Sequence, residues 1–138
     1  MIRVIVVDDY AKWRLFVAST LRTFPELQII GEAEDGPEAL LMAQELQPDL
    51  ILLDIGLPGL NGIEVARQLR KVSPTCKILF VSQTSSVEVA QGALNEGADG
   101  FVIKSEAAHD LLPAVRAVLE GKRFVSARLG SLQLIERR

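Results

Sequence analysis

Carboxylates follow two of the apolar runs that could form buried strands. The run from Ile2 to Val7 leads directly into Asp8 and Asp9, and the run from Leu50 to Leu53 leads into Asp54. Burying negative charge is costly unless a cation or a hydrogen-bond donor compensates it. These strand ends therefore predict a site that holds a cation.

The carboxylates also indicate which cation. Two carboxylates about 4 Å apart repel by roughly 4 kcal/mol at an effective dielectric constant near 20. Oxygen ligands favour a hard divalent ion, Mg²⁺ or Mn²⁺, whereas zinc favours His or Cys. In a parallel sheet of order 2-1-3-4-5, ligands bind between the carboxyl ends of the first and third strands.

A simpler alternative to a metal ligand is that Asp9 caps the first helix.

A hydroxyl and an ammonium group follow two further apolar runs. Ser82 ends "KILFVS", and Lys104 follows "GFVI". Beside a metal and a carboxylate, these groups are suited to hold a phosphoryl group, whose transfer depends on positioning and charge neutralisation. Asp54 would then be the nucleophile and would form an aspartyl phosphate. Singly, such a serine or lysine is more typical of a turn or a solvated surface.

These groups converge only if parallel strands end at one edge of a sheet. Short apolar runs alternate with amphipathic stretches along the chain, which is typical of strands joined by crossover helices. Five strands are predicted, at Ile2–Val7, Gln28–Ala33, Leu50–Leu53, Lys77–Ser82 and Gly100–Ile103. Five helices are predicted: one with an apolar face from Trp13 to Phe24 that ends before Pro25, then Pro37–Leu46, Gly62–Val72, Ser86–Glu96 with Gly97 as its terminator, and a stripe from Leu111 to Leu119 closed by Gly121.

Length and composition favour a single soluble domain. The chain has 138 residues, and 15 Lys plus Arg stand against 18 Asp plus Glu, so the charge does not predict a nucleic-acid surface. The apolar runs are far shorter than the roughly 20 residues of a membrane span, and no secretory leader is expected. The single cysteine, Cys76, lies in an apolar run and favours a reducing cytoplasm.

The segments "VVDD", "LLDIGLPGLNG", "FVS" and "GADGFVIK", in this order and spacing, resemble the receiver domain of bacterial two-component response regulators. The resemblance covers residues 2 to 119. It implies a CheY-like α/β fold, with three layers and a doubly wound, five-stranded parallel sheet of order 2-1-3-4-5. It also implies a signalling switch and not an enzyme that turns over an external substrate.

The same resemblance implies roles for individual residues. Asp8, Asp9, Asp54 and the backbone carbonyl of Gly56 would bind Mg²⁺, and Asp54 would accept a phosphoryl group from a histidine kinase. Ser82 would contact that group and Lys104 would pair with it. In receivers, an aromatic side chain on the fifth strand turns inward when the hydroxyl residue moves. Phe101 matches that position, although a plain core aromatic is nearly as good an explanation.

Three positions depart from the family pattern. Gln83 replaces a small residue next to Ser82, and its side chain is expected to narrow access to the phosphoryl site or to contact the phosphate. Ser105 follows Lys104 where receivers commonly have a proline after a cis bond, which leaves the reach of Lys104 open. Gly56 leaves no side chain over the phosphoryl site, so it should neither assist nor block attack by water.

The segments "FPELQIIGEAEDGPEAL" and "EGKRFVS" resemble the NarL/FixJ (LuxR-type) subgroup, in which a linker and a helix-turn-helix DNA-binding domain follow the receiver. Residues 1–120 are therefore expected to form the receiver, and residues 121–138 a linker or the start of an output element. A segment of a transcriptional regulator is favoured over a stand-alone receiver. The fourth helix, fifth strand and fifth helix are the expected surface for partners or a homodimer.

Other interpretations compete with the receiver. A haloacid-dehalogenase-type phosphatase also uses an aspartate and Mg²⁺, but it needs a second acid where this chain has Tyr10. A degenerate receiver that only binds proteins is disfavoured by the complete site. The single histidine, His109, is expected on the surface and not as a phosphate carrier. Trp13 is expected to pack in the core near the acids, where its fluorescence could report metal binding.

Overall fold

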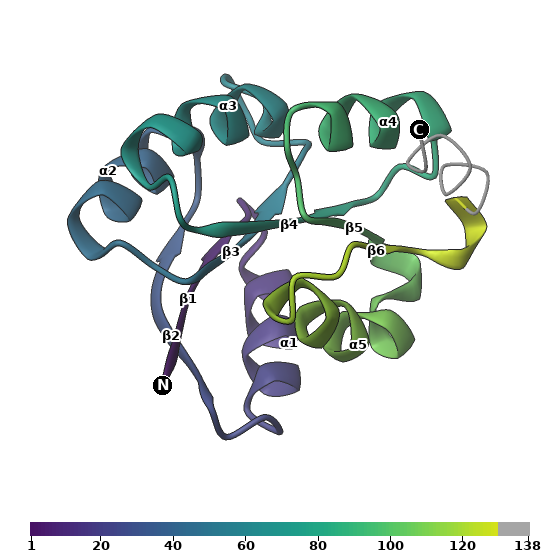
Figure 1. Ribbon diagram of the computed structural model, residues 1–138, viewed down its shortest axis with the longest axis horizontal. Helices are drawn as coiled ribbons and strands as arrows, with labels where there is room; N and C mark the ends of the chain where they lie inside the picture. The colour runs from purple at the N-terminus through teal and green to yellow at the C-terminus, as the bar shows by residue number, and fades with distance from the viewer. Residues whose placement is uncertain (130–138) are drawn as a thin grey trace.

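The structure, a computed structural model, describes residues 1–129 and contains a six-stranded parallel sheet (Figure 1). The strands are β1 (Ile2–Val7), β2 (Leu27–Ala33), β3 (Leu50–Asp54), β4 (Lys77–Ser82), β5 (Gly100–Ile103) and β6 (Phe124–Val125). Their order in the sheet is β2-β1-β3-β4-β5-β6. The order predicted for the first five strands is confirmed.

Helices cover both faces of this sheet (Figure 1). The helices α2 (Gly36–Leu46), α3 (Gly62–Val72) and α4 (Val87–Asn95) lie on one face, and α1 (Ala11–Leu21) and α5 (Ala107–Leu119) lie on the other. Two short 3₁₀ turns, Lys104–Glu106 and Ala127–Leu129, flank α5 and β6. The predicted three-layer, doubly wound α/β architecture is confirmed. The first five strands and the helices α2, α3 and α4 agree with the predicted ranges to within one residue, whereas α1 ends before Phe24 and α5 begins at Ala107, before the predicted Leu111.

Local signals in the sequence explain where several helices begin and end. The side chain of Asp35 accepts a hydrogen bond of 2.9 Å from the backbone N–H of Glu38 at the start of α2. Gly97 follows α4 with a φ of 90°, a left-handed conformation that glycine adopts without strain. The N-cap position of α1 is Tyr10, which makes no side-chain capping bond. The alternative in which Asp9 caps the first helix is therefore wrong.

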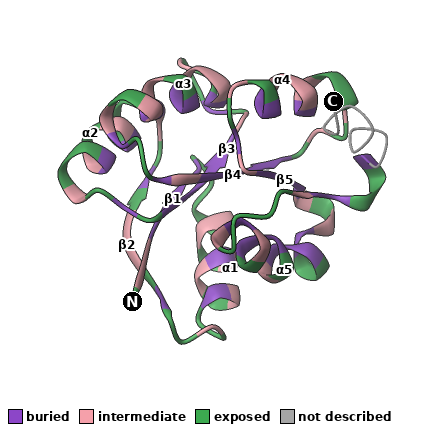
Figure 2. Cartoon of the chain, viewed as in Figure 1, coloured by how far each residue is buried: buried purple, intermediate pink, exposed green. Residues whose placement is uncertain are grey.

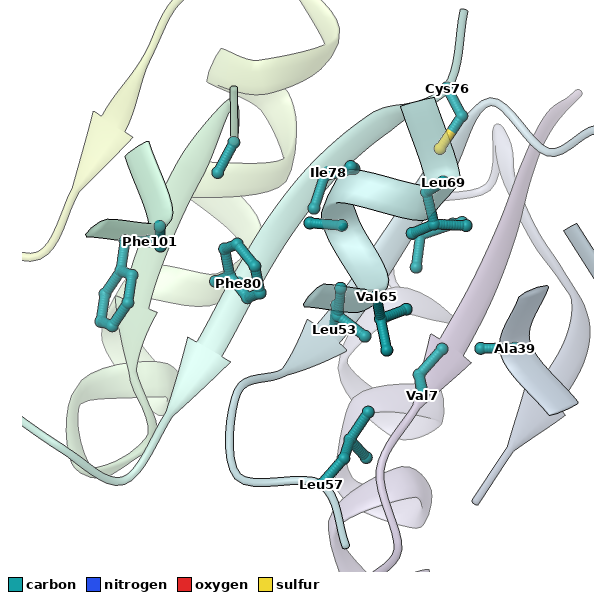
Figure 3. Close-up of a cluster of buried hydrophobic side chains, with 14 of the residues drawn as sticks. Val7, Ala39, Leu53, Leu57, Val65, Leu69, Cys76, Ile78, Phe80 and Phe101 are labelled. Carbon is teal, nitrogen blue, oxygen red and sulfur yellow. The ribbon is translucent and has the colours of Figure 1, made fainter. Parts of the chain in front are cut away.

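The apolar strand runs supply the two cores on either side of the sheet. Most residues of β1, β3, β4 and β5 are buried, whereas most residues of β2, at one edge of the sheet, are half-buried or exposed, and the outer helix faces are exposed (Figure 2). Phe80 on β4 and Phe101 on β5 are fully buried on the α2–α3–α4 side, and their ring centroids lie 6.4 Å apart (Figure 3). The two rings fill the core beneath β4 and β5, which are paired in parallel register and lead to the predicted site.

The sixth strand is a correction to the prediction of five. Phe124 pairs with Gly100, and Val125 pairs with Phe101. Two residues are too few to show a strand period, which is why the sequence did not reveal β6. Of the predicted linker, residues up to Leu129 lie against the domain, and residues 130–138 lie outside the described residues.

A buried serine, Ser126, holds the segment after β6 against the domain through hydrogen bonds. Ser126 is fully buried; its Oγ accepts a hydrogen bond of 3.0 Å from the N–H of Ile103 and donates one of 3.0 Å to Oδ2 of Asp110. The backbone N–H of Ser126 also donates to the carbonyl of Phe101 at 3.1 Å. One side chain thus joins β5, α5 and the segment after β6.

Replacing this serine should destabilise the domain. Ser126→Ala leaves a buried N–H and a buried carboxylate without their shared partner, so we expect a loss of about 1–3 kcal/mol in the free energy of unfolding. Chemical denaturation measures this loss. Ser19→Ala, at an exposed position on α1, is the control and should change stability by about 0.5 kcal/mol or less. Equal effects of the two variants would contradict the assigned role of Ser126.

Candidate functional site

Three carboxylates meet at the carboxyl ends of β1 and β3. These strands are neighbours in parallel register, with Val7 opposite Leu53, so the residues that follow them emerge side by side. One carboxylate oxygen from each of Asp8, Asp9 and Asp54 lies within 4.8 Å of the others. Asp8 and Asp54 are buried, and Asp9 is exposed. The convergence predicted from the sequence is confirmed.

Lys104 reaches this cluster from the end of β5. Its Nζ donates a hydrogen bond of 2.6 Å to Oδ2 of Asp8 and lies 3.8 Å from Oδ2 of Asp54. The peptide bond to Ser105 is trans, as are all others in the described part of the chain. The serine in place of proline therefore does not prevent Lys104 from entering the site.

Backbone donors hold the acids in place. The N–H of Gly56 donates to Oδ1 of Asp54 at 3.1 Å, and the N–H of Tyr10 donates to Oδ1 of Asp8 at 2.9 Å. A Cβ atom at Gly56 would lie 3.8 and 3.9 Å from the two carboxylate oxygens of Asp54. Because glycine has no Cβ, the approach to Asp54 is open on this side.

The cluster lies in a cleft of about 840 Å³. Besides the three acids and Lys104, the cleft is lined by Gly56, Ser82 and Gln83, as the sequence predicted for this edge, and by Tyr10, Ile55, Thr84 and Val89. Ser82 is buried, and its Oγ accepts a hydrogen bond of 3.1 Å from the N–H of Thr84. Sequence reasoning missed Thr84, although the hydroxyl-rich run "SQTSS" was a signal for it.

The surroundings of Asp54 change the pKa of its carboxyl group. Burial raises the pKa of Asp54 above its usual range, and the negative charges of Asp8 and Asp9 add to that rise. The Lys104 ammonium and the N–H of Gly56 oppose it, but burial is the larger effect. The carboxylate of Asp54 is thus kept in a partly dehydrated environment with too little positive charge around it.

The donor set fits a hard divalent cation. All three side chains offer oxygen, and their separation of at most 4.8 Å lets one ion lie among them. The single ammonium of Lys104 neutralises only one of three negative charges, so a cation would relieve the remaining repulsion. Asp8, Asp9 and Asp54 are the residues that could hold it, and Gly56 lines the same cleft.

Three other residues singled out from the sequence lie around or away from the cleft. His109 is 92% exposed at the start of α5, where it contacts Asp110, as expected of a surface residue. Phe101 points into the core and does not line the cleft. Trp13 packs against the α5 side of the core, as predicted, and its ring also lies 4.9 Å from Nζ of Lys104, a contact that the sequence did not reveal.

Comparison with known proteins identifies the family. The family model described as "Response regulator receiver domain" matches residues 4–116. The chain belongs to this family. The receiver is thus the correct choice among the interpretations that the acids left open, and receivers are phosphoryl-accepting signalling modules that bind Mg²⁺ at an acidic pocket.

Curated relatives are regulators of the NarL type. The chain is 35% identical over 129 residues to the response regulator GacA of Pseudomonas protegens, covering 94% of the chain and 61% of the relative. It is 34% identical over 126 residues to the nitrate/nitrite response regulator NarL of Escherichia coli, covering 91% of the chain and 58% of the relative. The receiver thus spans about three fifths of the length of these proteins.

Solved structures agree with this placement. A LuxR-family response regulator from Aurantimonas superposes with a TM-score of 0.90 at 31% identity, covering 98% of this chain and 96% of that one. The response regulator domain of Thermotoga maritima CheB has a TM-score of 0.79 at 33% identity, covering 87% of this chain and 97% of that one.

Within residues 1–129, the helices lack the length and apolar character needed to cross a bilayer.

The raised pKa of Asp54 predicts that its carboxylate lowers the free energy of unfolding at neutral pH and not at low pH. A group whose pKa is higher in the folded state stabilises the fold at low pH and loses that contribution as pH rises through its folded pKa. Without divalent cations, Asp54→Asn should therefore be more stable than the wild-type receiver at pH 7, with the difference shrinking towards pH 4. Thermal melts across this range in EDTA test it, and a difference that grows on acidification would contradict the assignment.

Proposed function

We propose that Asp54 is the phosphoacceptor of a phosphorylation-dependent switch and that the phosphoryl donor is a sensor histidine kinase. The observation that carries this proposal is the position of Asp54, whose carboxylate lies in the open cleft close to Asp8, Asp9 and Lys104. Asp8 shares these neighbours, but both of its carboxylate oxygens accept hydrogen bonds, from the N–H of Tyr10 and from Lys104. Of the two Asp54 oxygens, Oδ1 accepts a hydrogen bond from the N–H of Gly56, whereas Oδ2 lies 3.8 Å from Lys104, too far for a hydrogen bond.

The transfer makes one bond and breaks one. An Oδ atom of Asp54 forms a bond to phosphorus while the P–N bond of the phosphohistidine breaks, and the electron pair leaves with the imidazole. Lys104 and Ser82 line the same cleft, and their ammonium and hydroxyl groups would contact the phosphoryl oxygens. Slow attack by water returns the carboxylate and inorganic phosphate, so the protein turns over only its own phosphate.

A divalent cation belongs to the same proposal. Asp8, Asp9, Asp54 and the backbone carbonyl of Gly56 would hold Mg²⁺, or Mn²⁺ in its place. When bound, such an ion neutralises charge on the transferring phosphoryl group. The chain's own part is to fix the acids through the N–H groups of Tyr10 and Gly56.

Access and switching depend on four residues in this proposal. Gln83 is exposed and lines the cleft, so its side chain limits access or contacts the phosphate, whereas Gly56 places no side chain beside the carboxylate of Asp54. Ser82 moves towards the phosphoryl group, and Phe101 follows by burial and shape, since it has no hydroxyl. The buried position of Phe101 supports an inward-turned state.

We place the output beyond the receiver. Residues 1–120 act as the receiver, and residues 121–138 lead to an output element, most simply a DNA-binding domain that regulates transcription in the cytoplasm. The GacA and NarL relatives, which extend well beyond the matched region, support this arrangement. Phosphorylation would promote a homodimer. A stand-alone receiver that acts through protein contacts is the second choice.

Phosphorylation of Asp54 can be tested with a small phosphodonor. Incubation with acetyl phosphate and Mg²⁺ should give one base-labile adduct in the intact mass spectrum, and Asp54→Ala should give none. Asp35→Asn, which alters the cap of α2 away from the cleft, is the control and should still be modified. An adduct that persists in Asp54→Ala would place the nucleophile elsewhere.

The metal ligands can be tested by stability. Asp9→Asn should raise the melting temperature in EDTA by a few degrees at most, because Asp9 is exposed and its repulsion is screened. The same variant should gain no stability from Mg²⁺, whereas the wild-type protein should gain stability through binding. Glu45→Gln, at an exposed position on α2, is the matched control. An Asp9→Asn variant that Mg²⁺ still stabilises would refute Asp9 as a ligand.

A further inference from the structure

The ammonium group of Lys104 has two kinds of neighbour, carboxylates and an aromatic ring. On one side are the carboxylates, with Nζ 2.6 Å from Asp8 and 3.8 Å from Asp54. On the other side is the indole of Trp13, whose ring centroid lies 4.9 Å from Nζ. The Lys104 side chain is only 13% exposed, so little water competes with these contacts.

Trp13 is held firmly enough to act as a support. It comes from α1, and its ring centroid lies 5.1 Å from that of Phe16 on the same helix. It packs against the core cluster that α5 contributes to, which includes Ala107 and Leu111. The indole is therefore fixed by the packing of α1 and α5, and not by the lysine that it contacts.

We propose that Trp13 is a positioning residue that holds Lys104 at the phosphoryl site. The face of an indole attracts an ammonium group electrostatically and takes up none of its three N–H donors in a directed hydrogen bond. The donors of Lys104 remain available for Asp8, Asp54 and, on the proposed function, a phosphoryl group. An aliphatic side chain of similar bulk would fill the space without this attraction.

The geometry also makes Trp13 a sensor of Lys104. The 3.8 Å between Nζ and Asp54 is too long for a hydrogen bond, whereas the bond to Asp8 is short. A phosphoryl group on Asp54 would draw the ammonium away from Asp8, and its distance from the indole would change with it. Trp13 is the only tryptophan in the chain, so the tryptophan emission comes from this one site.

The first test compares phosphorylation rates. With acetyl phosphate and Mg²⁺, Trp13→Leu should slow formation of the Asp54 adduct by about 3- to 10-fold, and Trp13→Phe, which keeps an aromatic face, should recover most of the rate. Phe24→Leu is the matched control, because it removes another partly buried aromatic of the same core, whose ring lies against Arg116. Equal rates for Trp13→Leu and Phe24→Leu would overturn the proposal.

The second test does not depend on phosphorylation or on tolerance of changes at Trp13. Lys104→Met should change the intensity or maximum of the Trp13 emission in the absence of any ligand, whereas Lys12→Met, at an exposed position on α1, should not. An unchanged spectrum in Lys104→Met would overturn the contact. If the wild-type protein forms no Asp54 adduct, the proposed function fails, and the emission of the lysine variants still decides whether Trp13 contacts Lys104.

Discussion

The structure depends on an imbalance of charge at one edge of its sheet. Three carboxylates face one ammonium, and two of those carboxylates are buried. Burial raises the pKa of Asp54 more than Lys104 lowers it, so the resting site is electrostatically unsatisfied. A site of this kind gains stability by binding a cation, and an anionic phosphoryl group can be accepted only when positive charge accompanies it. The receiver's chemistry follows from that imbalance.

The scaffold keeps the like charges together against their repulsion. Parallel register between β1 and β3 fixes where Asp8 and Asp54 leave the sheet. Arg14 on α1 adds a second restraint: one guanidinium N–H donates to the carbonyl of Asp8 at 2.7 Å, and another donates to Glu32 on β2 at 2.9 Å. The turn that carries the acid pair is thus tied to a helix and to a neighbouring strand, so the acids cannot relax apart by moving their backbone.

Most of this arrangement was predictable because it depends on local sequence features. Apolar runs mark the strands, and the polar residue that ends each run marks the cleft, which is why Asp8, Asp54, Ser82 and Lys104 could be assigned to one edge. The contact between Trp13 and Lys104 could not be predicted, because it depends on how α1 packs beside the turn after β5. The two-residue β6 likewise has no period of its own and exists only because β5 offers a free edge.

That free edge links the cleft to the end of the described chain. β5 has four residues, and Lys104 follows its last one. In the same strand, the N–H of Ile103 donates a hydrogen bond to Ser126 Oγ, and the carbonyl of Phe101 accepts one from the N–H of Ser126. Because these bonds are buried and directional, β5 cannot shift relative to β6 without breaking them. A displacement of Lys104 that moves β5 must therefore also move Ser126, so hydrogen bonds through β5 connect the cleft to the segment after β6.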